Sequence, residues 1–158
     1  MDMSRQINNI IAITASLICI GLINFAGQNI DIEIRGINAF TFILFVAVIL
    51  QIIFFIPSFL LKTEKYYDLV GSLTYIATVS LAYFSVENKT MIDSIIYFYV
   101  MVWALRLGIY LFRRVRNDGK DVRFEQAKRH FLWFLQYWMG QALWVSLTAC
   151  AAIIAILS

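Results

Sequence analysis

RRVRNDGKDVRFEQAKR, from Arg113 to Arg129, is a polar stretch between two long apolar runs, and it holds seven of the thirteen Lys and Arg residues of the chain. Polar connections between apolar runs of bilayer length are typical of proteins that cross a membrane several times. A connection rich in Lys and Arg favours the cytoplasmic side. This stretch therefore predicts a multi-span membrane protein and gives it an orientation.

The composition agrees with this class. Hydrophobic residues make up 61% of the 158 residues and charged residues 15%. A soluble domain of this size needs more polar residues to cover its exterior. Membrane topology already accounts for the positive charge, so we expect membrane lipids as partners and no nucleic acid.

Stretches free of Asp, Glu, Lys and Arg recur along the chain, and most reach the roughly 20 residues that a helix needs to cross a bilayer. They predict an all-α bundle of about five transmembrane helices, which forms a single domain over residues 1–158. The predicted spans are residues 7–25, 37–61, 66–86, 91–112 and 131–157, with a basic loop at 113–130.

The distribution of Lys and Arg predicts the orientation. If the amino terminus is cytoplasmic, or on the matrix side, the inner segments hold ten basic residues and the outer connections hold only Arg35 and Lys89. Such asymmetry favours this topology over its reverse. We therefore expect the loop at 113–130 on the same side as the amino terminus, and the carboxy terminus on the opposite side.

Arg106 lies inside the fourth apolar run, where an Arg costs roughly 2.5 to 3.5 kcal/mol on insertion scales. Trp103, Arg106, Tyr110 and then Arg113 or Arg114 recur every three or four residues and share one helix face. The guanidinium of Arg106 either reaches toward the interface, about 10 Å along the helix, or finds a partner within the bundle.

Asp68, near the start of the third run, is the partner we expect for Arg106. Asp68, Gly71 or Ser72, and Tyr75 share a helix face, and the small residues permit close helix approach. Such an ion pair either braces the bundle or lines a ligand pocket. In the fifth run, Gln136, Gln141 and Trp144 serve either helix packing or ligand contact.

The basic loop also contains Asp118 and Asp121, and a turn signal at Asn117 to Gly119. The loop is either a simple determinant of topology that contacts anionic lipids, or a phosphate site in which Arg side chains bind a dinucleotide or a phospholipid head group. Metal chemistry is not expected, because His130 is the only His and the two Cys lie in separate spans.

Four segments together carry a family resemblance. They are YDLVGS at 67–72, WALRLGIYLFRR at 103–114, GKDVRF at 119–124 and QALWV at 141–145. In their order and approximate spacing they resemble the amino-terminal half of the membrane reductases of the steroid 5-alpha-reductase type, and among these a bacterial-type branch.

This resemblance implies an all-helical membrane enzyme that uses NADPH to reduce a carbon–carbon double bond conjugated to a carbonyl in a sterol-like or other lipidic substrate. It also implies two groups of site residues. The residues expected at a substrate cavity are Asp68, Tyr75, Trp103 and Gln141. The residues expected near the cofactor are Arg106, Tyr110, Arg113, Arg114, Asp121 and Arg123.

The resembled family also carries an Arg-His-Pro-x-Tyr-like motif in a later loop, and this chain lacks it, since its only Pro is Pro57. We therefore expect that NADPH does not bind to this chain alone. Three interpretations remain open: part of a split or truncated reductase that a second polypeptide completes, a multi-span or lipid-binding subunit without catalysis, or a small transporter-like or scaffold bundle.

Overall fold

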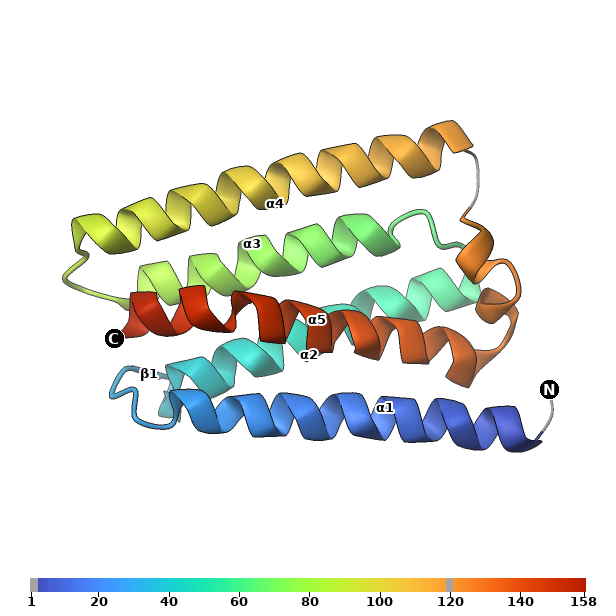
Figure 1. Cartoon of the computed structure of the whole chain (residues 1–158), viewed down its shortest axis with the longest axis horizontal. Coiled ribbons are helices and arrows are strands. Elements are labelled where there is room, and N and C mark those ends of the chain that lie inside the picture. The colour runs from blue at the N-terminus through green and yellow to red at the C-terminus, as the bar shows by residue number, and fades with distance from the viewer. Residues whose placement is uncertain (1–2, 119–120) are drawn as a thin grey trace.

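The computed structural model of the protein describes residues 3–118 and 121–158, and within them five long α-helices lie side by side (Figure 1). The helices are α1 (Met3–Asn24), α2 (Ala39–Leu60), α3 (Tyr67–Ser85), α4 (Met91–Asp118) and α5 (Phe131–Leu157). Two short antiparallel strands, β1 (Glu33–Ile34) and β2 (Ile37–Asn38), join α1 to α2. The 3-10 helices are η1 (Phe25–Gly27), η2 (Val122–Phe124) and η3 (Ala127–Arg129).

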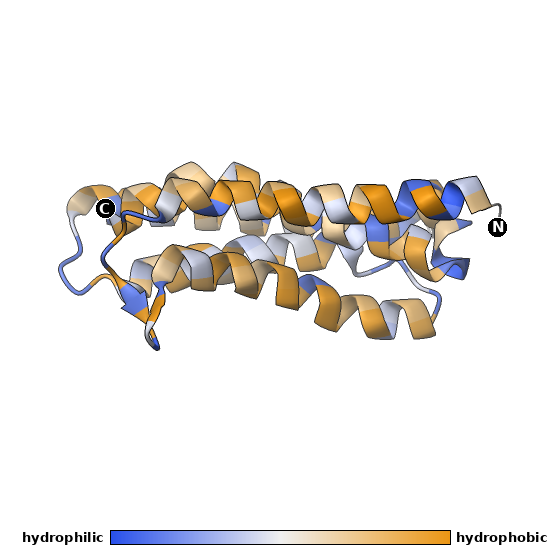
Figure 2. Ribbon diagram, turned by 90° about the horizontal axis from the view of Figure 1, so that it is seen from below, coloured by the Kyte–Doolittle hydropathy of each residue, from blue (hydrophilic) through white to orange (hydrophobic). Residues whose placement is uncertain are grey.

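Four segments are long and apolar enough to cross a membrane: Met3–Gly27, Ala39–Leu60, Met91–Asn117 and Phe131–Leu157. Hydrophobic residues run along the helices, and hydrophilic residues gather toward the two ends of the bundle (Figure 2). The prediction of an all-α, multi-span integral membrane protein is confirmed. Helix α3, of 19 residues, is not among these four, and the predicted count of about five spans stays a prediction.

Helix α3 is less apolar because its polar side chains find partners inside the bundle, between α2, α4 and α5. Thr74 Oγ1 accepts a hydrogen bond from the Gln51 amide of α2 at 2.9 Å. Ser72 Oγ donates to the Ala104 carbonyl of α4 at 2.5 Å, and the Tyr75 hydroxyl is hydrogen-bonded to Thr148 of α5. The side of α3 that faces the other helices does not need the apolar surface of a helix side that faces lipid.

Helix α4 is longer than predicted. The fourth span was expected to end at residue 112, but α4 continues to Asp118, so Arg113, Arg114 and Arg116 lie on its last turns rather than in a loop. Arg is a good helix former, and basic side chains are favourable at a helix carboxy terminus. The predicted turn at Asn117 to Gly119 falls partly on residues 119–120, which lie outside the described residues.

The segment after α4 folds back over the ends of α3 and α5. Phe124 of η2 is 1% exposed and lies between two tyrosines, with ring centroids 4.7 Å from Tyr67 and 4.9 Å from Tyr137. Burial of a Phe side chain contributes roughly 1.5 to 3 kcal/mol. This anchor holds the neighbouring polar residues of η2 against the start of α3.

Candidate functional site

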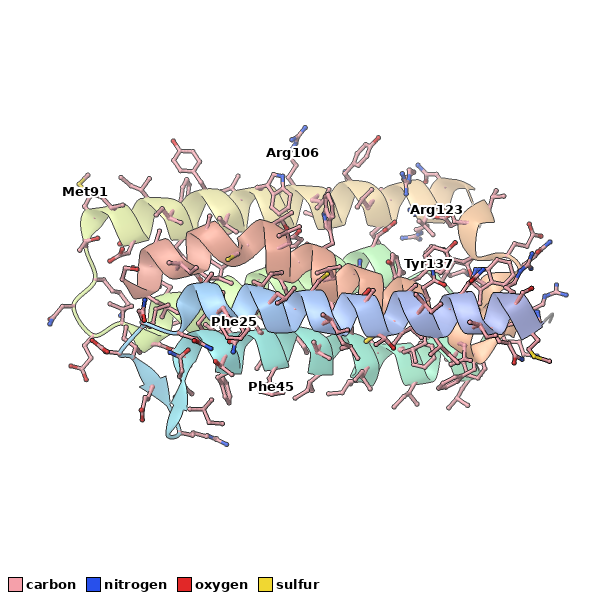
Figure 3. All side chains as sticks on the ribbon, turned by 60° about the horizontal axis from the view of Figure 1, so that its bottom comes forward. Phe25, Phe45, Met91, Arg106, Arg123 and Tyr137 are labelled. Carbon is pink, nitrogen blue, oxygen red and sulfur yellow. The ribbon has the colours of Figure 1, made fainter. Side chains whose placement is uncertain are left out.

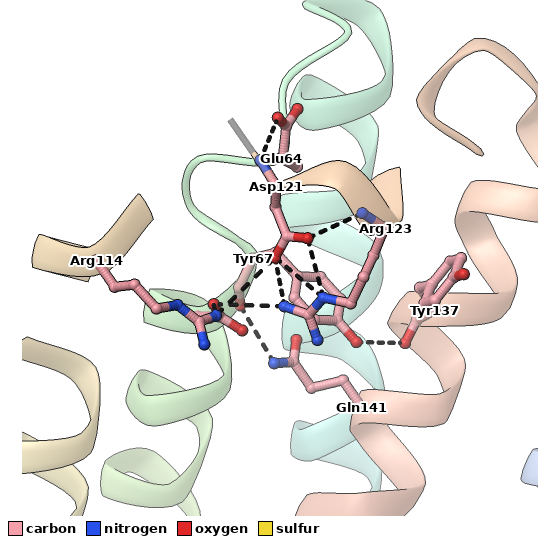
Figure 4. A network of polar contacts seen from close by, with 8 residues as sticks. Glu64, Tyr67, Arg114, Asp121, Arg123, Tyr137 and Gln141 are labelled. Atoms are coloured by element: carbon pink, nitrogen blue, oxygen red, sulfur yellow. Dashed lines mark hydrogen bonds and ion pairs between the residues drawn. The ribbon is translucent and has the colours of Figure 1, made fainter. Parts of the chain in front are cut away.

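Four charged residues from three elements meet where η2 lies against the start of α3, and we call them the charged cluster (Figure 4). Asp68 of α3 accepts a hydrogen bond from Arg114 of α4 at 3.3 Å and lies 3.8 Å from the Arg123 guanidinium. Asp121 lies 2.5 Å from Arg123 and 4.0 Å from Arg114. The two carboxylates are shielded, with side chains 12% exposed.

Local sequence explains the geometry of η2. Asp121 caps this short helix by accepting the backbone N–H of Arg123 at 3.0 Å, as Asp does at helix starts. Arg123 Nε donates to both carboxylate oxygens of Asp121 at 3.0 Å. These hydrogen bonds lower the pKa of the Asp121 carboxyl below its ordinary value, although partial burial opposes them.

Glu64 ties the same segment to the connection between α2 and α3. It is 4% exposed, its carboxylate lies 2.6 Å from the Lys128 ammonium, and it accepts the Asp121 backbone N–H at 3.3 Å. A buried carboxylate with two such partners fixes the position of the loop rather than acting in chemistry. The sequence alone does not predict the contact between Glu64 and Lys128.

The charged cluster borders a cavity of about 640 Å³ between α3, α4 and α5, with α1 along one side; we call it the α3–α5 cavity. Its polar lining residues include Tyr67, Asp68, Ser72, Tyr75, Arg123, Gln136 and Gln141. Its apolar lining residues include Trp103, Leu107, Leu111, Trp144 and Val145. The cavity is therefore amphipathic.

The cavity opens sideways as well. Trp103 of α4 and Trp144 of α5 both line it, and they are 44% and 63% exposed. Both residues lie well inside helices that can cross a membrane. In a bilayer, this side of the cavity would therefore border the lipid.

Gln141 of α5 lines the cavity. Its amide nitrogen donates to the Tyr67 carbonyl oxygen at 3.2 Å, and its Oε1 atom is buried without a hydrogen-bond partner among the described residues. Gly71 makes room for this side chain, because a Cβ at position 71 would lie 2.2 Å from Gln141 Nε2. A buried carbonyl oxygen without a donor favours a ligand that supplies one.

Tyr67 braces the same wall. Its hydroxyl donates to the Tyr137 carbonyl oxygen of α5 at 2.9 Å, and its ring packs edge-on against Trp138, with centroids 5.3 Å apart. Tyr67 belongs to the motif at 67–72, but the sequence predicts no role for it or for Tyr137. The contact between Tyr67 of α3 and Tyr137 of α5 depends on how the two helices pack, so a single sequence does not reveal it.

The structure brings together the four residues predicted at a substrate cavity. Asp68, Tyr75, Trp103 and Gln141 all line the α3–α5 cavity. The six residues predicted near a cofactor divide into two groups. Arg114, Asp121 and Arg123 join Asp68 in the charged cluster. Arg106, Tyr110 and Arg113 lie on the exposed face of α4, in a second hollow that Arg114 also borders.

The predicted ion pair between Asp68 and Arg106 is wrong. Arg106 is exposed and points away from the bundle (Figure 3), whereas Asp68 pairs with Arg114 and Arg123. The reason is the face that α4 presents to α3. Ala104 is fully buried, and a Cβ at Gly108 would lie 2.5 Å from Ser72 Oγ. Arg106 is two residues from each of them. Because successive residues are 100° apart around a helix, Arg106 lies on nearly the opposite side of α4 and points outward.

Comparisons with known proteins add a family and no more. No curated protein and no solved structure matches the chain significantly. Among residues 3–118 and 121–158, no group of three or more His, Cys, Asp or Glu side chains could hold a metal ion. One family model covers residues 54–158, a range that contains the charged cluster and most of the cavity. The chain belongs to this family, described as "Protein of unknown function (DUF1295)".

Proposed function

We propose that the α3–α5 cavity binds an amphipathic lipidic molecule, and that the chain serves as the substrate-holding part of a membrane reductase of the type it resembles. The observation that carries this proposal is the combination of a charged and hydrogen-bonding end with an apolar side opening between Trp103 and Trp144. Ligand pockets typically combine apolar walls with a few polar groups that fix orientation.

The ligand enters from the bilayer with its polar group toward the charged cluster. The Arg123 guanidinium, whose side chain is 53% exposed, can donate a hydrogen bond to a carbonyl or hydroxyl oxygen. The free Oε1 of Gln141 can accept one from a hydroxyl. Trp103 and Trp144 then contact the apolar body. A sterol-like molecule with an oxygen at one end satisfies all of these contacts.

The cavity does not fit the phosphate-bearing part of NADPH. The charged cluster contains two guanidinium groups and two carboxylates, and its arginines are paired with its aspartates at 2.5 to 3.8 Å. A dinucleotide with several phosphate charges needs an excess of positive charge at its site. The proposed role of this chain is therefore to hold the substrate, while any reduction requires cofactor-binding residues from a second polypeptide or another part of a larger protein.

Intrinsic fluorescence tests ligand binding. A brominated sterol-type enone should quench the purified chain saturably, because bromine reaches Trp103 and Trp144 when the ligand is in the cavity. Trp103→Phe combined with Trp144→Phe should abolish the saturable part, and the control variant Trp133→Phe should retain it. Quenching that rises linearly with ligand and is equal in all variants contradicts a cavity site.

A parallel titration with NADPH separates binding from catalysis. The chain alone should give no saturable response, and a response that appears with a co-purifying polypeptide supports a split reductase. Ligand binding with no NADPH response in any assembly favours a lipid-binding subunit without catalysis. Saturable NADPH binding by the chain alone contradicts the electrostatic argument.

The orientation is also part of the proposal, with the charged cluster on the cytoplasmic side. Val122 in η2 is 75% exposed, and Asn88 lies in the exposed connection at the other end of α3. In a chain with Cys19 and Cys150 replaced by Ser, an impermeant maleimide added to intact cells should label Asn88→Cys and not Val122→Cys. The reverse pattern inverts the topology.

A further inference from the structure

A second hollow, of about 580 Å³, lies on the exposed face of α4 outside the α3–α5 cavity, and we call it the arginine hollow. It is lined by Arg106, Ile109, Tyr110, Arg113, Arg114 and Asn117. Arg106, Tyr110, Arg113 and Asn117 are separated by four, three and four residues, so they form one stripe along the helix. All four are exposed.

The arginine hollow has an excess of positive charge, in contrast to the charged cluster. None of its lining residues is acidic among the side chains that the structure describes, which exclude residues 118–120. Arg114 is paired with Asp68, but no ion pair joins Arg106 or Arg113 to a carboxylate among the described side chains. Two guanidinium groups about two helical turns apart are therefore left for an external anion.

The position along α4 indicates where that anion comes from. Arg106 lies inside a segment that can cross a membrane, and Arg113 lies near the end of the same segment. Arg106 points away from the bundle (Figure 3), so its guanidinium meets lipid rather than protein. An Arg at such a position reaches toward the interface, where lipid phosphates are the available anions.

We infer that the arginine hollow binds the phosphate of an anionic phospholipid head group. The guanidinium groups of Arg106 and Arg113 contact the phosphate oxygens, because planar guanidinium groups bind phosphate through paired N–H donors. Tyr110, 64% exposed between the two arginines, supplies a hydroxyl donor to the same group. Clusters of basic residues beside a transmembrane helix attract anionic lipid head groups, by about 1 kcal/mol per Lys or Arg near the surface.

Native mass spectrometry of the intact chain in neutral detergent tests this site. Dioleoyl phosphatidic acid is the probe, with dioleoyl phosphatidylcholine and inorganic phosphate as comparisons. Phosphatidic acid should bind more tightly than phosphatidylcholine by about tenfold or more, because each basic residue near a lipid surface contributes to the attraction. The double variant Arg106→Gln/Arg113→Gln should lose that preference.

The matched control is Lys65→Gln/Arg116→Gln, which removes the same charge at the same end of the bundle but from a different hollow. It should retain the preference for phosphatidic acid. Circular dichroism establishes that both double variants keep their helices. An equal loss in the two variants, or no loss in either, overturns the site. If equimolar inorganic phosphate displaces phosphatidic acid, the proposal of a phospholipid ligand is wrong and the hollow binds free phosphate.

Discussion

Arg114 donates a hydrogen bond to Asp68 at 3.3 Å and so joins the last turns of α4 to the first turn of α3, 46 residues earlier in the chain. The contact lies between the α3–α5 cavity, which Asp68 lines, and the arginine hollow, which Arg114 lines. One ion pair therefore separates a site with balanced charge from a site with excess positive charge.

Replacing Asp68 by Asn removes the carboxylate that two arginines share. Arg123 keeps Asp121, but Arg114 loses its nearest partner, so we expect a loss of about 1 kcal/mol in the free energy of unfolding. Unfolding by denaturant in micelles measures it. The control is Glu87→Gln, at an exposed position at the far end of α3, which should change stability by less than about 0.5 kcal/mol. Equal losses in the two variants contradict the pairing.

Gly71→Ala should weaken ligand binding without unfolding the bundle. The new methyl group would lie 2.2 Å from Gln141 Nε2, so the flexible amide must move and its hydrogen bond to Tyr67 is lost. Affinity for the brominated enone should fall about tenfold, the effect of one lost hydrogen bond in a buried site. Gly21→Ala, where a Cβ meets nothing within 4 Å, should leave affinity unchanged. If Gly71→Ala leaves the affinity for the enone unchanged, Gln141 does not contact the ligand.

Lys128→Met should strongly destabilise the protein. The Glu64 side chain is only 3% exposed and would lose the ammonium 2.6 Å away, and removal of one partner from a buried pair costs about 3 to 5 kcal/mol. The double variant Glu64→Gln/Lys128→Met removes both charges and should recover much of the loss. Thermal unfolding followed by circular dichroism gives both values. Additive losses in the double variant would show that the two residues are not coupled.

The ion pair of Asp121 makes a pH-dependent contribution to stability. Because hydrogen bonds from Arg123 lower the pKa of Asp121 in the folded protein, the contribution is complete above the unfolded Asp value of about 3.9. It is lost as the pH falls through the lowered folded pKa. The difference in unfolding free energy between the wild type and Asp121→Asn should therefore be constant near neutral pH and shrink in acid. A difference that grows in acid contradicts the direction of the shift.

The sequence predicts most of the fold because long apolar runs leave few alternatives to membrane helices. It does not predict the polar contacts of α3, since hydrogen bonds such as Gln51 to Thr74 depend on packing and not on composition. It ends α4 too early at residue 112, because a run of basic residues indicates a loop although Arg is also compatible with a helix.

The candidate site is predictable only in part. Asp68 and Tyr75 share a face with Gly71, and this pattern correctly places them at a helix contact beside the cavity. Arg106 was misplaced, although Ala104 and Gly108, small and four residues apart, mark the face of α4 that packs on α3. The role of Glu64 could not be predicted, because it arises from Lys128, 64 residues away.

Photo-crosslinking tests the central claim, that an amphipathic lipid enters between Trp103 and Trp144, more directly than any other measurement. A sterol-type enone with a diazirine in its ring system is irradiated with the reconstituted chain, and the labelled peptides are identified by mass spectrometry. We predict labelling of α3, α4 and α5 at cavity-lining residues, abolished by excess unlabelled enone. Labelling that resists competition and spreads over lipid-facing residues such as Phe45 and Phe84 would contradict the account.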